Sequence, residues 1–186
     1  MKKIFFLLFT LCVCLSISAQ EHMKFMGIPL DGTIDNFALK LKAKGVTYDA
    51  ARSKSLPPGS KSYNGTFMGE KATFVVSFNT KSRVVFSVMV EMSYSSPDVA
   101  FYPFNDIVRQ LLAKYPNADR EEDQFCGDDE KGSVFHIYNK GEKKIGVIIQ
   151  RLRIPSSPYS TNCTIYLMYT DVDNLQKSEA INNEDL

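Results

Sequence analysis

Side chains that commonly carry catalysis or bind metals are scarce in this 186-residue chain, which has two histidines and no tryptophan. The histidines, His22 and His136, belong to no H-x-H or HExxH pattern, and no paired Cys/His spacing accompanies them. The chain also lacks the GxSxG and SxxK patterns of serine nucleophiles and a glycine-rich loop that could hold phosphate. We therefore expect no catalytic residue, no metal site and no cofactor.

Neither sign of charge dominates the chain. It has 22 Lys and Arg and 21 Asp and Glu, which gives a formal net charge of +1. Proteins that bind nucleic acids or anionic membranes are usually strongly basic, so we expect no nucleic-acid partner. Hydrophobic residues make up 44% and charged residues 23%, values of an ordinary globular domain that exclude disordered, collagen-like and coiled-coil chains.

The first 19 residues have the pattern of a secretory signal peptide. Lys2 and Lys3 precede an apolar run at 4–15, and small residues that end at Ala19 follow it. The run is too short to span a bilayer, which takes about 20 residues, and no second long apolar run follows. We expect cleavage after Ala19 and a periplasmic or extracellular protein without a membrane span; a lipid anchor at Cys12 or Cys14 is the alternative.

The sequence after the signal peptide predicts a first helix-plus-strands unit over residues 20–95. An extended lead-in at 20–29 precedes a helix at 33–44, where Thr33 is the expected N-cap and Gly45 the C-terminal stop. Apolar residues at helical spacing define the buried face: Ile34, Phe37, Ala38 and Leu41. A Pro-rich loop at 51–62 and three strands at 63–68, 72–78 and 83–92 complete the unit.

A second unit over residues 96–173 repeats this plan. Its helix has Pro103 in the first turn, an apolar face from Phe104 to Tyr115, and a stop at Pro116. Strands at 133–139, 144–152 and 163–170 follow, and residues 174–186 are expected to be a polar C-terminal tail.

The two units align along the chain, although identity is low. The helix ends are about 70 positions apart, whereas the hairpins at 70–90 and 130–150 are offset by 60. Structural duplication and chance similarity both remain open. The expected fold class is α+β: two helix-plus-antiparallel-meander units, with helices packed on one face of a continuous antiparallel sheet.

Residues Phe25 to Thr33, which read FMGIPLDGT, precede a helix that ends at 41–45 with LKAKG. Together with the signal peptide ending and the segment 112–116 (LAKYP), they resemble a group of uncharacterised secreted proteins of Bacteroidetes, whose second helix usually continues Tyr-Gly; Pro116 departs from that. The tandem plan is also similar to the β-lactamase-inhibitor-protein-like fold and to the BamE/SmpA lipoprotein domains. These resemblances imply protein binding rather than catalysis, and they carry over no residue roles.

Two cysteines remain after the signal peptide, Cys126 and Cys163. In an oxidising compartment they predict a disulfide, with two buried thiols as the alternative. The acidic segment 119–130 is expected to be a solvated loop, or alternatively a calcium-binding loop, although it does not match the EF-hand pattern. His136 is interpreted as an ordinary strand residue, with a role as a general base as the alternative.

The long connection at 154–160 is the best candidate for a recognition loop, since loops often carry binding residues. Its candidate residues are Ile154, Pro155, Ser156, Ser157, Pro158 and Tyr159. Tyr94, Tyr102 and Tyr159 flank loops, where tyrosines often make contacts.

The sequence thus predicts an exported, non-catalytic binding or interaction module of the cell envelope or secreted fraction, with an unidentified protein or envelope component as its partner. The alternatives are a small secreted ligand-binding protein or hydrolase that uses His136, and a calcium-stabilised envelope protein. The oligomeric state is undefined.

Overall fold

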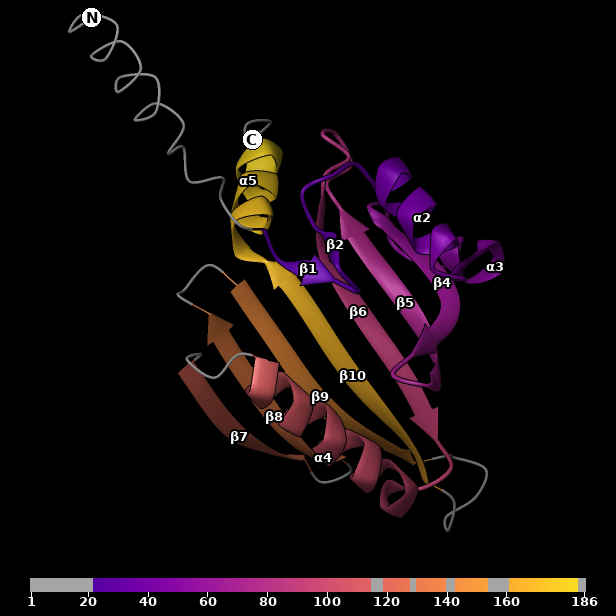
Figure 1. Cartoon of the computed structure of the whole chain (residues 1–186), viewed down its shortest axis with the longest axis vertical. Helices are drawn as coiled ribbons and strands as arrows, with labels where there is room; N and C mark the ends of the chain where they lie inside the picture. The colour runs from indigo at the N-terminus through magenta and orange to yellow at the C-terminus, as the bar shows by residue number, and fades with distance from the viewer. Residues whose placement is uncertain (1–21, 115–118, 128–129, 140–142, 154–160, 184–186) are drawn as a thin grey trace, which may run out of the picture.

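The computed structural model describes residues 22–114, 119–127, 130–139, 143–153 and 161–183, with side chains in 22–96, 98–114 and 163–182 (Figure 1). The fold is α+β with antiparallel sheets, as the sequence predicts. The helices are α2 (Ile34–Ala43), α3 (Ala50–Ser53), α4 (Pro97–Lys114) and α5 (Val172–Asn183). A small hairpin, β1 (Lys24–Phe25) with β2 (Ile28–Pro29), occupies the expected lead-in.

The main sheet has eight strands in the order β3-β4-β5-β6-β10-β9-β8-β7. The first four strands are β3 (Thr47–Asp49), β4 (Ser60–Phe67), β5 (Glu70–Phe78) and β6 (Val85–Tyr94). The other four are β7 (Asp119–Gly127), β8 (Glu130–Asn139), β9 (Lys143–Arg153) and β10 (Thr161–Asp171). The last strand of each group, β6 and β10, pair antiparallel at the centre, so the two four-stranded meanders join into one sheet.

This order gives the two halves the same topology: a helix followed by a four-stranded meander. It equates β5 with β9 and β6 with β10, whereas the hairpin offset of 60 had equated β5 with β8. Under the topological correspondence, β5 and β9 begin 73 residues apart, at Glu70 and Lys143, close to the 71 residues between Leu41 and Leu112 in the helices. The sequence offset of 60 therefore aligns each strand of the first unit with the strand that precedes its topological counterpart in the second unit.

The hydrophobic core lies on one face of the sheet. Cross-strand neighbours on that face, such as Phe74 with Val90 and Val76 with Val88, are fully buried. The same core contains Phe37 of α2, as well as residues of the β1–β2 hairpin and of α4. Both predicted helices thus cover this face, whereas the short α3, which the sequence analysis assigned to a loop, packs on the opposite face.

The contact of α3 with that opposite face is polar. Arg52 of α3 donates two hydrogen bonds to the Glu91 carboxylate of β6, at 2.8 and 2.6 Å. Asp49 caps α3 by accepting a hydrogen bond from the Arg52 backbone, and this bond is the main cause of a lowered Asp49 pKa.

The ends of the two predicted helices agree only in part with the expectation from the sequence. Thr33 occupies the N-cap position of α2 but makes no side-chain capping hydrogen bond; its backbone instead forms a bridge with Val84. Gly45 ends the helix with φ +81°, as predicted. Helix α4 begins six residues before Pro103 and follows Ser96, whose backbone carbonyl accepts a hydrogen bond from the Ala100 N–H. The apolar side chains of its first turns are exposed, so they do not extend the buried face that the sequence shows.

Two segments expected to be irregular are regular. The acidic segment is mostly strand β7 rather than a loop, and the expected polar tail from residue 174 belongs to α5. Helix α5 packs at the end of the sheet through buried polar residues: Asn79 in the β5–β6 turn donates to the Ser178 hydroxyl at 2.9 Å, and Asn174 donates to the Leu30 carbonyl. Because these contacts are polar, the spacing of apolar residues in the sequence does not indicate this helix.

Candidate ligand-binding site

Two turns with the same sequence, Phe-Met-Gly, meet on the core face of the sheet. The first, at 25–27, connects β1 to β2, and the second, at 67–69, connects β4 to β5. In each turn the methionine and the glycine are the two central residues and both have positive φ: 50° and 77° at Met26 and Gly27, 52° and 86° at Met68 and Gly69. Positive φ at both central residues is the signature of a type I′ hairpin turn.

Methionine is an unfavourable residue at its position in these turns. Type I′ turns favour Asn or Asp there, because a longer L side chain in the left-handed region costs about 1 kcal/mol. The described residues include one other non-glycine residue with clearly positive φ besides these methionines, Arg83. Strained residues of this kind often gather where a site needs a particular side chain.

The aromatic residue of each turn holds the two turns together. The rings of Phe25 and Phe67 stack, with centroids 5.8 Å apart and an interplanar angle of 10°. The Phe25 ring, which is fully buried, also meets Phe74 and Tyr169 edge-on, at 5.6 and 5.2 Å. This cluster anchors both turns to β5 and β10 and fixes the start of each methionine side chain.

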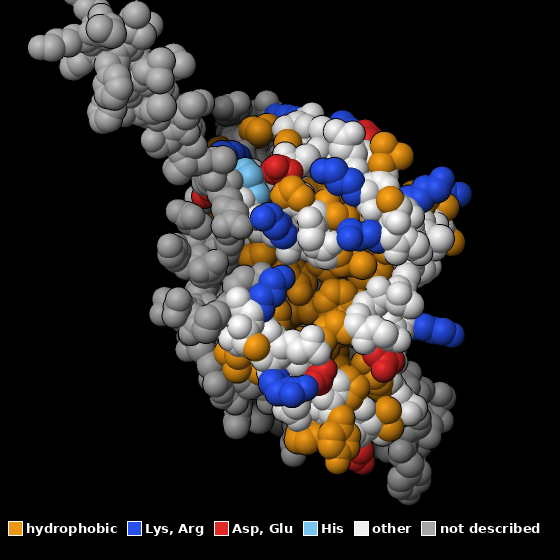
Figure 2. Space-filling view, in the orientation of Figure 1, with side chains coloured by type: hydrophobic (Ala, Val, Ile, Leu, Met, Phe, Trp, Pro, Cys, Tyr) orange, Lys and Arg blue, Asp and Glu red, His pale blue; other side chains and the backbone are white. Residues whose placement is uncertain are grey.

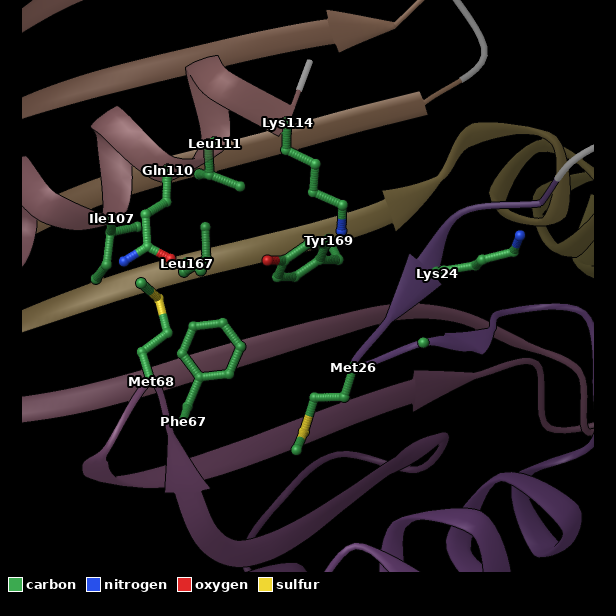
Figure 3. A pocket seen from close by; sticks show the side chains of 11 residues that line it. Lys24, Met26, Phe67, Met68, Ile107, Gln110, Leu111, Lys114, Leu167 and Tyr169 are labelled. Atoms are coloured by element: carbon green, nitrogen blue, oxygen red, sulfur yellow. The ribbon is translucent and has the colours of Figure 1, made fainter.

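Beside the two turns lies a pocket with a cavity volume of about 220 Å³ (Figure 3). Its walls come from the two turns and from the C-terminal half of α4, and its floor from β10. The lining residues are Lys24, Met26, Gly27, Phe67, Met68, Ile107, Gln110, Leu111, Lys114, Leu167 and Tyr169. Figure 2 shows the hollow in the middle of this face, with a hydrophobic floor and both basic and acidic side chains on its border.

The polar side chains that line the pocket include Gln110 and Lys114 of α4 and Tyr169 of β10. Lys114 lies in the last turn of α4, and the Tyr169 hydroxyl points into the pocket (Figure 3). Gln110, one turn earlier, donates its amide N–H to Asp106 at 2.6 Å. The end of the Lys24 side chain points away from the pocket (Figure 3). Apolar walls with a few polar groups are typical of a small-molecule site.

A second, more open groove of about 520 Å³ lies between α2 and the edge strand β3. Its lining includes Leu39, Lys42, Tyr48 and Tyr63. Leu39 and Tyr48 are 67% and 54% exposed, so apolar surface is present here too. The described residues that line this groove include neither a residue with positive φ nor a pair of turns.

Several residues predicted from the sequence lie outside the described parts of the chain. The candidate recognition loop, 154–160, lies outside the described residues. The side chain of His136, in β8, also lies outside them. The calcium alternative for 119–130 is not supported by the backbone, because an extended strand at 119–127 is not the turn from which a calcium loop supplies its oxygens. Within the part of the chain with described side chains, no group of three or more His, Cys, Asp or Glu could hold a metal ion.

The sheet order does not support the predicted disulfide. Cys163 lies on β10 and Cys126 on β7, with β9 and β8 between them. Three strand spacings separate the two backbones by about 14 Å. The Cα atoms of a disulfide lie within about 7 Å of each other, so the sheet holds these cysteines too far apart.

His22, expected in an unstructured lead-in, is instead fixed to the end of the sheet. Its Nδ1 lies 2.9 Å from Oδ2 of Asp171, which also accepts the backbone N–H of Met23 at 2.9 Å. The other oxygen of Asp171 accepts the backbone N–H of Asn174 and so caps α5. Because each oxygen of the carboxylate accepts a backbone N–H, Asp171 joins the segment at His22 to the first turn of α5.

Of the three tyrosines that flank loops, two have described side chains. Tyr102 is 78% exposed on α4, next to the exposed Phe101, with ring centroids 5.8 Å apart. The hydroxyl of Tyr94 is buried without a hydrogen-bond partner among the described residues.

Comparison with protein-family models, with curated proteins and with solved structures finds no match for this chain. The helices within the described ranges are all too short or too polar to cross a membrane. The paired Phe-Met-Gly turns were not singled out in the sequence analysis, although the repeated tripeptide was the signal that could have revealed them.

Proposed function

We propose that this protein is an exported, non-catalytic binding module and that the pocket between the two Phe-Met-Gly turns and α4 receives an apolar group of its ligand. The observation that carries the proposal is the placement of two strained methionines, Met26 and Met68, at one apolar pocket. Met26 packs partly against the core, whereas Met68 is 43% exposed, and contact with a ligand would bury the exposed part of both side chains. The signal-peptide pattern at 1–19 supports export.

Methionine suits such a role because its side chain is unbranched and polarizable. It adapts to ligands of different shape, which is why methionine is frequent on binding surfaces that accept several partners. In this pocket the methionine backbones are fixed by the stacked phenylalanines, while the thioether ends remain adjustable. The site therefore combines a rigid floor with an adaptable wall.

The proposal is tested with N-phenyl-1-naphthylamine, an uncharged apolar fluorophore. We expect the purified protein to raise its emission in a saturable, one-to-one titration. Gln110→Trp places a bulky ring at the exposed rim of the pocket and should weaken binding at least tenfold. The matched control is Asn105→Trp on the same helix, because Asn105 is exposed but does not line the pocket.

Absence of saturable binding, or equal weakening by both tryptophan variants, would overturn the pocket as a binding site. Export is tested separately by N-terminal sequencing of the protein recovered outside the cytoplasm, which should begin at Gln20. A protein that retains Met1 in the cytoplasmic fraction would overturn export without affecting the pocket.

A further inference from the structure

We infer that the edge strand β3 and the groove beside it bind an extended acidic segment of a partner protein, which adds to the main sheet as a further strand. This groove shares no lining residue with the central pocket, so the inference does not depend on the ligand of that pocket. Three observations carry it: an open strand edge, an exposed end of a buried aromatic row and a lysine whose charge is not compensated.

Strand β3 has a partner strand on one side only. Its three residues pair with Asn64, Tyr63 and Ser62 of β4, and β3 stands first in the order of the eight strands. No strand within the described ranges pairs with its outer edge. Every second residue of an edge strand directs its N–H and C=O outward, so an extended peptide can continue the hydrogen-bond ladder there.

The core face of the sheet continues to this edge and is uncovered there. Tyr48 of β3 is the cross-strand neighbour of Tyr63, which is in turn the neighbour of Phe74. Tyr63 and Phe74 are buried, whereas Tyr48 is mostly exposed, as is Leu39 of α2, which lines the same groove. The residue opposite Tyr48 on an added strand would have its Cβ about 5 Å from that of Tyr48. An apolar side chain at that position would bury both Tyr48 and Leu39.

The groove has the length of about three strand residues. Along α2 it extends from Asp35 to Lys42, seven positions that span about 10 Å of helix. Three residues of an extended chain cover the same distance, at about 3.3 Å each. An added strand would therefore direct two side chains into the groove: the one opposite Tyr48 and one that lies two positions away.

The two charged side chains of the groove differ in what they already contact. The Asp35 carboxylate accepts hydrogen bonds from Arg83 through both oxygens, at 2.9 Å each. Lys42 forms no ion pair and no hydrogen bond with any residue whose side chain the structure describes. The uncompensated charge of the groove is therefore positive, and a carboxylate two positions from the apolar residue would complement it.

A second copy of this chain fits the groove less well than an acidic peptide. If two copies joined at β3 around a two-fold axis, their α2 helices would run in opposite directions, and Lys42 of one copy would face the Asp35 end of the other. Arg83 already neutralises the carboxylate at that end, so Lys42 would gain no unpaired acid. An acidic segment of a different protein supplies one.

The test measures binding of the purified protein to the fluorescein-labelled peptide Thr-Glu-Thr-Phe-Thr-Glu-Thr-amide by fluorescence anisotropy. The alternation places the phenylalanine and both glutamates on one face, so one glutamate reaches Lys42 in either strand direction. We expect saturable binding with a Kd below about 1 mM. Lysine in place of both glutamates should weaken binding about three- to tenfold, and alanine in place of phenylalanine about tenfold.

Two N-methylated peptides test whether the peptide adds as a strand. One is methylated at the amides of the threonines, and the other at the amides of the phenylalanine and the glutamates. Only every second amide of an added strand faces β3, so one form should bind at least about tenfold more weakly while the other keeps its affinity. Equal affinity of the two forms would overturn strand addition.

Variants of the protein locate the contact. Lys42→Met should remove the preference for glutamate over lysine in the peptide, whereas Lys40→Met, on the same helix but outside the groove, should keep it. Leu39→Ala should weaken binding about fivefold. Val99→Ala shortens an exposed side chain of α4 and should leave binding unchanged. A circular dichroism melt verifies that each variant is folded.

The remaining outcomes would overturn the inference. They are the absence of saturable binding up to about 1 mM, and a preference for glutamate that survives Lys42→Met. Analytical ultracentrifugation examines the second copy: a dimer that dissociates in Leu39→Ala would assign this edge to self-association instead of a peptide. None of these variants should alter binding of N-phenyl-1-naphthylamine, so failure at the sheet edge is distinguishable from failure of the central pocket.

Discussion

Phe25 and Phe67 are 42 positions apart in the sequence, yet their rings stack with centroids 5.8 Å apart. Each ring precedes a Met-Gly turn, so the stack brings two otherwise independent hairpins together. The consequence is that both methionines line one pocket at a fixed separation. Stability and binding should therefore respond in opposite directions to a change at the exposed Met68.

The first prediction exchanges methionine for the residue that the turn prefers. Met68→Asn should raise the free energy of unfolding by about 0.5–1 kcal/mol, because Asn tolerates positive φ and Met68 is exposed. In Met26→Asn the same gain is offset by the loss of apolar contact with the core. Both should weaken fluorophore binding, since the thioether is lost. Met168→Asn is the control: it lies in β10 without positive φ, where Asn is disfavoured, and should be destabilising. Destabilisation by Met68→Asn would show that the turn is not strained.

The second prediction concerns Asn79, which is 3% exposed and links the β5–β6 turn to α5. Its Oδ1 accepts the backbone N–H of Lys81 and of Ser82, and its Nδ2 donates to Ser178. Asn79→Ala should lower the free energy of unfolding in urea by about 2–3 kcal/mol, because buried partners lose their hydrogen bonds. Asn105→Ala, which removes one exposed bond, should cost less than about 0.5 kcal/mol.

A third prediction follows from the three hydrogen bonds that Asp171 accepts. Asp171→Ala should release both the segment at His22 and the first turn of α5, at a cost of about 2–4 kcal/mol in unfolding free energy. Hydrogen exchange should show faster exchange at the amides of Met23 and Asn174. Asp173→Ala, two residues along in the same helix turn, should leave the Met23 amide protected; equal loss in both variants would contradict the role of Asp171.

The fourth prediction is a pH dependence. Burial is the main cause that raises the pKa of Tyr63 and of Tyr94 to about 12, from 10.0. Because the folded-state pKa lies above the unfolded one, these neutral phenols contribute stability that is complete below pH 10 and is lost as pH rises through 12. Absorbance at 295 nm should reveal a late phase near pH 12 that shrinks in Tyr63→Phe and Tyr94→Phe. Tyr102→Phe, which removes an exposed phenol, should leave this late phase intact.

Removal of the Tyr94 hydroxyl also has a thermal consequence. The group is buried without a hydrogen-bond partner among the described residues, so Tyr94→Phe should leave the melting temperature unchanged or raise it. A fall of several degrees would indicate a hydrogen bond that the described part of the chain does not contain.

The fifth prediction is that Cys126 and Cys163 do not form a disulfide with each other, because two strands separate β7 from β10. Peptide mapping under non-reducing conditions should find no peptide that links the two residues. Detection of that linked peptide would require a different arrangement of the outer strands.

Much of the fold could be predicted from periodicity. The helix expected at 33–44 is found at Ile34–Ala43, and the strands expected at 72–78 and 144–152 are found at Glu70–Phe78 and Lys143–Arg153. Apolar residues recur at regular intervals in these elements, so their pattern is visible in the sequence. The start of α4 was missed because Val99, Phe101 and Tyr102 are exposed and lie outside the buried stripe.

Elements fixed by polar contacts could not be predicted in this way. Helix α5 is fixed through Asn174 and Ser178, and α3 through the ion pair of Arg52 with Glu91. The sequence of β7 is too acidic to show a strand pattern, and it forms a strand because β8 supplies the partner backbone. Each of these elements depends on a partner that is distant in the sequence.

The sequence by itself determined the α+β class, the alternation of helices with antiparallel strands and the positions of the apolar faces, because local spacing decides which side chains can be buried together. Only the tertiary structure decided that β6 pairs with β10 and that the two Phe-Met-Gly turns meet across a pocket. A tripeptide is too short to show a periodicity, so the sequence alone does not indicate that its two copies form one site. The two copies come together because packing of the whole sheet brings both turns to the same face.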